Sequence, residues 1–394
     1  MWTVFLLSFA AQQAPSAKPA QTYTALVCAE SADEVHEVRF DGKQASVTRV
    51  HRLGAWPTEI EGPHGLGVDP SGDAWYVTLA HGNPFGSLHK IDAASGEIMG
   101  SCNLGLFPAS LCVSPVTGLL YCVNFDLHGD MTPSDVSVVD TEAMVEVGRT
   151  RVGAMPHGSR LDPSGLRVFV CSMMDGTLVE LDGETFDVRR RLLLEPRPSA
   201  KVLAEQLAAR KAAEAAGRPV PVGPDHDHTR RRLPQRSQGL AEEEAIPEDE
   251  HGITRPTWVA PDPQRGRVYV CLNAADEVVE VDTRRWVVTR RFATGPKPYN
   301  AEVSSDGKSL LVTYKGGQAV GIWDLESGLE RARIASSAPI PHGVVISADS
   351  RFAFVSCENR GASPGRLDVI DVSAGVMVTS VAVGLQAGGI ALLP

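Results

Sequence analysis

The stretch MPHGSRLDPSGLRVFVC, residues 155–171, contains the pattern that decides the fold. It reads as Pro-His-Gly, a short strand, an Asp-Pro-Ser-Gly turn and a second strand. The same phrase occurs as GPHGLGVDPSGDAWYVT at residues 62–78 and as IPHGVVISADSRFAFVS at residues 340–356. Weaker copies begin at residues 107, 255 and 297. A phrase repeated along a chain indicates an architecture assembled from copies of one supersecondary unit.

The spacing of the copies identifies that architecture. The proline of the phrase falls at residues 63, 108, 156, 256, 298 and 341, which gives steps of 45, 48, 100, 42 and 43 residues. Repeats of roughly 40–50 residues with four short strands each are typical of β-propeller blades. Residues 23–50 supply three more strands and residues 387–393 a fourth, so the chain ends complete a seventh blade. The sequence therefore predicts an all-β, seven-bladed propeller over residues 22–394, closed so that no sheet edge is exposed.

Several short motifs carry a family resemblance. These are second strands like Tyr-Val-x-Asn, the run Val-Ser-Val-Val-Asp-Thr at residues 136–141, Val-Gly-x-x-Pro-x-Gly connections and turns like Ser-Pro-Asp-Gly. Together they resemble the YVTN-type β-propeller repeat, over nearly the whole chain outside one insert. The resemblance implies the fold, but it covers envelope binding proteins, lactonases and redox enzymes alike. Function must therefore be argued from the site.

Two segments stand apart from the repeats. Residues 1–20 contain a short apolar run followed by small residues, which predicts a signal peptide and linker and hence an exported, periplasmic or extracellular protein. Residues 195–253 form an insert between blades 4 and 5, with a predicted helix at 199–216 followed by a charged loop. The composition of that loop is typical of a mobile segment, whereas its length is typical of a lid over a functional site.

Composition limits the partners. The formal net charge of -11 argues against nucleic acid, and after the N-terminal run no segment is apolar enough to span a bilayer. The seven cysteines fall mainly at equivalent strand positions, which predicts buried apolar side chains rather than a disulfide framework. We expect a monomer. No Cys-x-x-Cys-His motif or cupredoxin ligand cluster occurs in the sequence, so any redox chemistry needs O₂ or an external electron-transfer partner.

The histidines gather on one predicted face. Eight of the 11 fall in or beside the connections that enter a first strand or leave a second strand, and these are His64, His81, His128, His157, His226, His228, His251 and His342. His64, His157 and His342 belong to the repeated phrase itself and open the innermost strands of blades 2, 4 and 7. Three imidazoles spread around a channel mouth predict a metal site with an open position, for which copper or zinc is suited. Histidines at this position could equally line a wet channel mouth without a metal.

Other residues of this face complete the predicted site. Glu358 follows a second strand in the blade of His342, so it is the candidate general base or hydrogen-bond partner, with His81 and His128 as further catalytic candidates. Trp258, Tyr299 and Asn300 are candidates for the floor of a substrate pocket. His226, His228 and His251 are candidates for a lid over it.

Three functions follow as hypotheses. The first is an exported metalloprotein that takes a small molecule or peptide at the channel mouth, as an oxidoreductase in preference to a metal-dependent hydrolase. Its predicted architecture is similar to the histidine-ligated copper propellers of nitrous oxide reductase and copper-dependent thiol oxidases. The second is a non-catalytic cell-envelope propeller that binds a protein, peptide or glycan. The third is a metal-independent lactonase.

Overall fold

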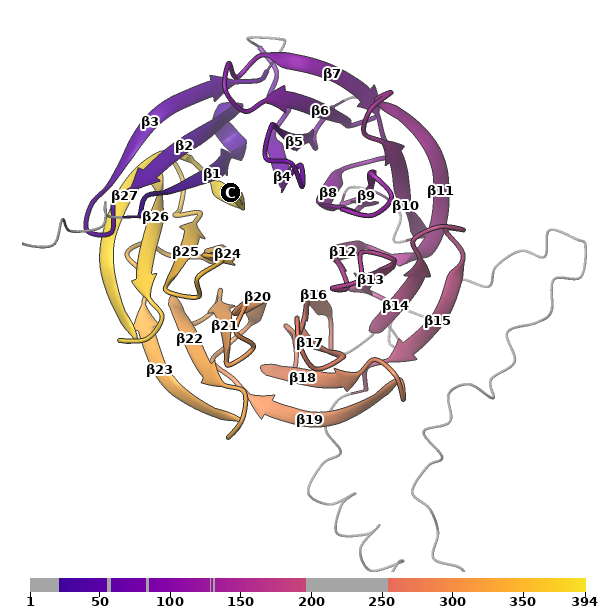
Figure 1. Cartoon of the computed structure of the whole chain (residues 1–394), viewed down its shortest axis with the longest axis vertical. Helices are drawn as coiled ribbons and strands as arrows, with labels where there is room; N and C mark the ends of the chain where they lie inside the picture. The colour runs from indigo at the N-terminus through magenta and orange to yellow at the C-terminus, as the bar shows by residue number, and fades with distance from the viewer. Residues whose placement is uncertain (1–20, 55–57, 83–84, 128, 130–131, 196–253) are drawn as a thin grey trace, which may run out of the picture.

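The computed structural model describes residues 21–54, 58–82, 85–127, 129, 132–195 and 254–394. These residues form seven four-stranded antiparallel sheets arranged as a ring around a central channel (Figure 1). The predicted seven-bladed all-β fold is thereby confirmed. The only helical element among the described residues is a 3-10 turn, η1 (Glu30–Ala32). The predicted signal peptide and the predicted helix at 199–216 lie outside the described residues, as does the insert from 196 to 253.

Each blade runs from an innermost to an outermost strand. Blade 1 consists of β28 (Ala387–Leu393), β1 (Tyr23–Ala29), β2 (Glu34–Phe40) and β3 (Ala45–Arg52). Blade 2 consists of β4 (Pro63–Val68), β5 (Ala74–Leu79), β6 (Ser87–Asp92) and β7 (Ile98–Asn103). Blade 3 consists of β8 (Pro108–Val113), β9 (Leu119–Asn124), β10 (Pro133–Asp140) and β11 (Val145–Ala154). Blade 4 consists of β12 (Pro156–Leu161), β13 (Arg167–Ser172), β14 (Thr177–Asp182) and β15 (Val188–Leu193). Blade 5 consists of β16 (Pro256–Pro261), β17 (Arg267–Leu272), β18 (Glu277–Asp282) and β19 (Val287–Ala293). Blade 6 consists of β20 (Pro298–Val303), β21 (Ser309–Tyr314), β22 (Ala319–Asp324) and β23 (Leu329–Ala335). Blade 7 consists of β24 (Pro341–Ile346), β25 (Phe352–Cys357), β26 (Pro364–Asp371) and β27 (Val376–Leu385).

The two ends of the chain close the ring in blade 1. β28 pairs antiparallel with β1, with Val27 opposite Ile390, and β1 continues to β2 and β3. The C-terminal strand therefore lies innermost, beside the channel and next to β4 (Figure 1). Closure therefore pairs the inner edge of β1 with the C-terminal strand and joins the first and last parts of the chain within one blade.

A left-handed backbone residue precedes every innermost strand. These residues have φ between 44° and 63°, and they are Gly62, Phe107, Met155, Arg255, Lys297, Ile340 and Gln386. The carbonyl of each accepts a hydrogen bond from the N–H of the residue that directly follows the second strand of the same blade, as in Lys315 N to Lys297 O at 3.0 Å and Glu358 N to Ile340 O at 3.0 Å. This repeated link brings the start of each innermost strand and the end of each second strand together.

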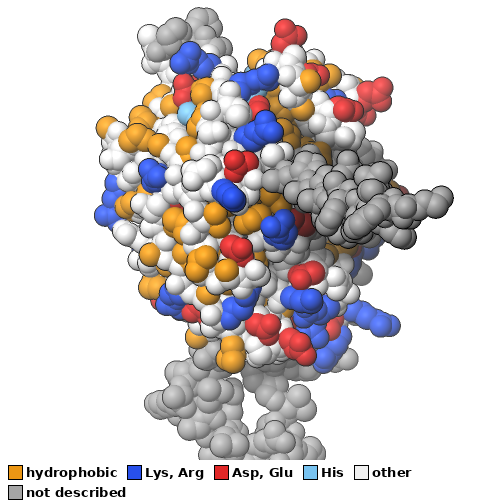
Figure 2. All heavy atoms as spheres, turned by 60° about the vertical axis from the view of Figure 1, so that its left-hand side comes forward, with side chains coloured by type: hydrophobic (Ala, Val, Ile, Leu, Met, Phe, Trp, Pro, Cys, Tyr) orange, Lys and Arg blue, Asp and Glu red, His pale blue; other side chains and the backbone are white. Residues whose placement is uncertain are grey.

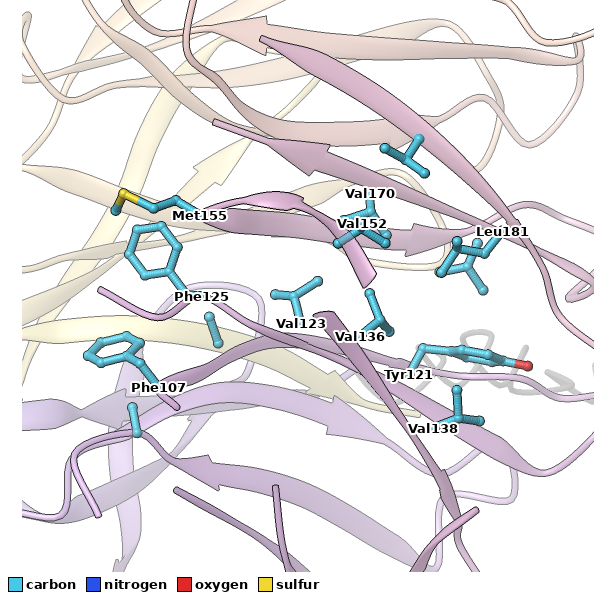
Figure 3. Packing of buried hydrophobic residues seen from close by; sticks show 14 residues of the cluster. Phe107, Tyr121, Val123, Phe125, Val136, Val138, Val152, Met155, Val170 and Leu181 are labelled. Atoms are coloured by element: carbon cyan, nitrogen blue, oxygen red, sulfur yellow. The ribbon is translucent and has the colours of Figure 1, made fainter. Parts of the chain in front are cut away.

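The hydrophobic core lies between neighbouring blades. Figure 3 shows one such cluster, where Phe107, Tyr121 and Phe125 of blade 3 pack against Met155 and Val170 of blade 4. Each fully buried side chain of this size stabilises the fold by roughly 1.5–3 kcal/mol. The hydroxyl of Tyr121 donates to the carbonyl of Gly183 across the interface, so burying the phenol leaves no polar atom unpaired there.

The remaining sequence expectations concern thiols and the surface. All seven cysteines are free thiols, and five of them are buried. Burial raises the pKa of the Cys171 and Cys271 thiols, as expected for small apolar core residues. Acidic and basic side chains are interspersed on the side of the ring in Figure 2. Within the described ranges, no helical segment has both the length and the apolar composition of a membrane span.

Candidate functional site

Two positions of the blade repeat bring side chains to the channel mouth. The first is the second residue of the innermost strand, which in blades 1 to 7 is Gly388, His64, Ala109, His157, Thr257, Tyr299 and His342. The second is the residue directly after the second strand, which is Glu30, Ala80, Phe125, Met173, Asn273, Lys315 and Glu358. The charged members all come from blades 6, 7 and 1, whereas blades 3 and 4 contribute Phe125 and Met173. The mouth is therefore polar on one side and apolar on the other.

The three predicted histidines converge. The ring centroid of His64 lies 6.4 Å from that of His157 and 6.0 Å from that of His342. Tyr299 lies between His157 and His342, and its ring centroid is 5.2 Å from that of His157 and 4.8 Å from that of His342. His64, His157 and His342 come from β4, β12 and β24, in blades 2, 4 and 7 as the sequence predicts. The fold thus gathers one aromatic cluster from four blades.

Glu30 joins two histidines of blade 2. Its Oε2 lies 2.9 Å from Nδ1 of His64, and its Oε1 lies 2.8 Å from Nε2 of His81. Burial would by itself raise the pKa of Glu30, but the charge and hydrogen bonds of the two imidazoles outweigh it and lower this pKa to about 2. Glu30 is therefore an ionised buried carboxylate that fixes the orientation of the His64 ring.

His157 is held at both ring nitrogens. Nδ1 lies 3.0 Å from the carbonyl oxygen of Thr257, which can only accept, so Nδ1 carries the proton. Nε2 is then the acceptor, and the hydroxyl of Tyr299 donates to it at 2.7 Å. Burial and the neighbouring charge of His64 lower the pKa of His157 to about 3, so the ring is neutral. Burial also raises the pKa of Tyr299 well above its usual value, which keeps the phenol protonated.

Blades 6 and 7 place an ion pair beside this cluster. Nζ of Lys315 lies 2.7 Å from Oε1 of Glu358 and 3.6 Å from the centroid of the Tyr299 ring. The same Glu358 oxygen lies 3.7 Å from Nε2 of His342. Burial lowers the pKa of Lys315, although the charge of Glu358 opposes the shift. Burial and the charge of Lys315 lower the pKa of His342 well below its usual value, so this imidazole is neutral too.

A small axial cavity of about 30 Å³ adjoins the cluster. Its lining includes the three histidines together with Arg160, Trp258 and Asn300. Three buried polar atoms of this lining have no hydrogen-bond partner: Nδ1 of His342, Oδ1 of Asn300 and Nε1 of Trp258. Eight further buried side-chain atoms of the described residues lack a partner, but none of them belongs to a residue of this cavity. The concentration of unpaired groups in one wall marks the cavity as the candidate binding site.

The imidazoles do not form a ready metal centre. In the described part of the chain, no group of three or more His, Cys, Asp or Glu side chains is arranged to hold a metal ion. At His157 the Tyr299 hydroxyl occupies the nitrogen that a metal would need. The donor chemistry nonetheless suits a transition metal, because His157 and His342 are neutral and Nδ1 of His342 is unpaired.

Most of the predicted site residues fall in this cluster. The fold brings together His64, His81, His157, Trp258, Tyr299, Asn300, His342 and Glu358. His128, His226, His228 and His251 lie outside the described residues. The sequence prediction omits Glu30 as a site residue. Its signal is positional, since Glu30 directly follows a second strand just as Glu358 does.

The fold and this cluster define a seven-bladed β-propeller with a one-sided polar site at its axial mouth. No family model matches the chain, so membership of the YVTN family stays a prediction. No curated protein matches it either.

Among solved structures, the chain resembles a functionally unknown protein from Desulfotomaculum acetoxidans, at 12% identity and a TM-score of 0.67 over 94% of this chain and 98% of that one. A protein from Lactobacillus plantarum matches at 12% identity and a TM-score of 0.66, over 94% and 100% of the two chains. Kuenenia stuttgartiensis hydrazine synthase matches at 16% identity and a TM-score of 0.59, over 85% and 91%. At these identities the likeness concerns the fold alone.

Proposed function

We propose that this protein binds a small polar molecule in the axial cavity at the histidine cluster. The observation that carries the proposal is that three residues lining one cavity each have a buried polar atom without a partner: Nδ1 of His342, Oδ1 of Asn300 and Nε1 of Trp258. Each buried unpaired polar group costs about 1–3 kcal/mol, which an occupant with matching donors and acceptors recovers. The side chains that line the cavity come from the innermost strands of a closed ring, and such a rigid framework favours binding of a small molecule.

Thermal stabilisation tests the proposal. Untagged protein is heated with a panel of small polar molecules of two to four heavy atoms and with simple lactones, and binding is then measured by calorimetry. We expect at least one compound to raise the melting temperature of wild type but not of the His342→Ala, Asn300→Ala double variant. His89→Ala is the matched control, because Nδ1 of His89 is also buried and unpaired but His89 is not part of the cavity lining. Equal stabilisation of the double variant would contradict the proposal.

A transition-metal ion, copper or zinc, is the second candidate. Hydrogen bonds at one nitrogen of two of the imidazoles favour this candidate. Nδ1 of His64 contacts Glu30, and Nδ1 of His157 donates to the carbonyl oxygen of Thr257. Metal-binding histidines usually make such outer contacts. His64, His157 and His342 would hold the ion once the Tyr299 hydroxyl leaves Nε2 of His157. Copper would supply redox chemistry and zinc Lewis-acid chemistry.

Metal analysis separates the two candidates. Native, untagged protein and the triple variant His64→Ala, His157→Ala, His342→Ala are compared by elemental analysis and visible spectroscopy. Stoichiometric copper or zinc in wild type, absent from the triple variant, supports the second candidate. Equal metal content in both excludes these histidines as its ligands.

Export is also part of the proposal. The apolar run and small residues within positions 1–20 support it. Cell fractionation and N-terminal sequencing of the mature protein test it: an intact Met1 in cytoplasmic protein would contradict it.

A further inference from the structure

The cavity wall carries an unusual balance of charge. Among the described residues that line it, Arg160 is the only Lys or Arg, and none is Asp or Glu. The carboxylates of Glu30 and Glu358 contact the outer nitrogens of His64 and His342 instead. Arg160 is therefore the permanently charged side chain among the described residues that line the cavity.

The guanidinium of Arg160 has N–H groups available to donate to a ligand. It follows His157 by three residues on β12, and its guanidinium carbon lies 4.4 Å from the centroid of the Trp258 ring, which orients the guanidinium plane. Nη1 donates to the carbonyl oxygen of Ser159 at 2.9 Å, which uses one of five N–H groups. Across the described ranges, no carboxylate lies within 4.0 Å of this guanidinium. Burial raises the pKa of Glu302, and the positive charge of Arg160 opposes this shift.

The side chains that carry the unpaired atoms can all present an N–H donor. The indole Nε1 of Trp258 is a donor only, and Nδ1 of His342 donates in one of its two neutral tautomers. Rotation of the Asn300 side-chain amide by 180° presents the donor Nδ2 in place of Oδ1. The wall therefore offers several N–H groups around one permanent positive charge.

The volume of the cavity limits the size of the ligand. A cavity of about 30 Å³ gives room for about two or three water-sized positions. We propose that the axial cavity binds a small monovalent anion of about three heavy atoms, of the class of formate, nitrite or azide, held by the Arg160 guanidinium and the Trp258 indole N–H. This inference rests on the proposed function, since it names the chemical class of the same ligand.

Anion titration of the full-length protein tests the inference. Metal-free protein is titrated calorimetrically with sodium formate, nitrite and azide at constant ionic strength, with tryptophan fluorescence as a second readout. We expect Arg160→Gln to weaken binding by at least about tenfold and Arg160→Lys by less, because the ammonium keeps the charge but not the planar fork. Arg167→Gln is the control, since Arg167 lies on the neighbouring strand β13 and pairs with Asp162 outside the cavity.

The outcomes separate this inference from the proposed function. Anion binding by wild type and the Arg167→Gln control that is lost in Arg160→Gln, with an unchanged melting temperature, supports the inference. Equal anion affinity in the Arg160→Gln variant overturns it. If neutral formamide binds and the anions do not, the inference fails and the proposed function stands. If neither formamide nor any anion binds at millimolar concentration, the inference fails, and the thermal-stabilisation panel decides the proposed function.

Discussion

The hydroxyl of Tyr299 donates a hydrogen bond to Nε2 of His157 at 2.7 Å, although the residues are 142 positions apart and belong to blades 6 and 4. The intervening blade 5 completes the arrangement, because the carbonyl of Thr257 accepts from Nδ1 of the same ring. Three consecutive blades thus fix one neutral imidazole. The ring cannot rotate without breaking a buried hydrogen bond.

Removing this hydroxyl should cost stability. We expect Tyr299→Phe to lower the free energy of unfolding by about 1–3 kcal/mol, because Nε2 of His157 is left buried and unpaired. Urea denaturation measures the loss. Tyr121→Phe is the matched control, as it removes a buried interblade hydrogen bond to Gly183 far from the cavity. Only Tyr299→Phe should alter ligand binding, and if metal binds, its affinity should rise because Nε2 becomes free. Identical binding by both variants would show that the contact is purely structural.

The buried neutral histidines predict a pH dependence of stability. The unfolded chain binds a proton at each imidazole near pH 6.5, whereas folded His157 does so only near its pKa of about 3. Between these values the unfolded state binds more protons, so stability present above pH 6.5 is lost as the pH falls. Each such histidine contributes up to about 1.4 kcal/mol per pH unit. Urea unfolding at pH 7.5 and 5.5 measures the slope, which should become shallower in His157→Gln. An unchanged slope would mean that His157 titrates normally.

Glu30 should act as a positioning residue. We expect Glu30→Gln to lower the free energy of unfolding by roughly 2–3 kcal/mol, because two charge-assisted hydrogen bonds to His64 and His81 are weakened. It should also reduce the affinity for the axial ligand, since the His64 ring loses its fixed orientation. Glu280→Gln is the control: Glu280 is a buried acid paired with Arg290, away from the cavity. Comparable destabilisation by both substitutions, with reduced ligand affinity only in Glu30→Gln, is the expected result.

The closing strand is packed tightly against the site. A Cβ on Gly389 of β28 would lie 1.9 Å from the carbonyl oxygen of His64, whereas one on Gly388 would meet nothing nearer than 3.9 Å. We expect Gly389→Ala to destabilise the protein by about 1–3 kcal/mol through overpacking between blades 1 and 2. Gly388→Ala should change the melting temperature little. Equal effects of the two substitutions would contradict the close packing of β28 on β4.

Much of this arrangement could be predicted from the sequence, for a physical reason. The Pro-His-Gly phrase repeats with the blade, so its histidines must occupy equivalent positions on innermost strands, and His64, His157 and His342 do so. The same reasoning places Glu358, because it directly follows a second strand. Side-chain pairings between blades could not be read this way. Whether Tyr299 reaches His157, or Lys315 reaches Glu358, depends on the curvature of the ring and on rotamers that no repeat pattern encodes.

The central claim is that the axial cavity holds an exchangeable small ligand. A crystal structure of untagged protein, at a resolution that separates water from polyatomic species, tests it most directly when the crystals are grown with sodium nitrite or formate. We expect a polyatomic ligand in contact with Nδ1 of His342, Nε1 of Trp258 and the Arg160 guanidinium. A cavity containing only water under these conditions, or closed by direct hydrogen bonds between these side chains, would contradict it.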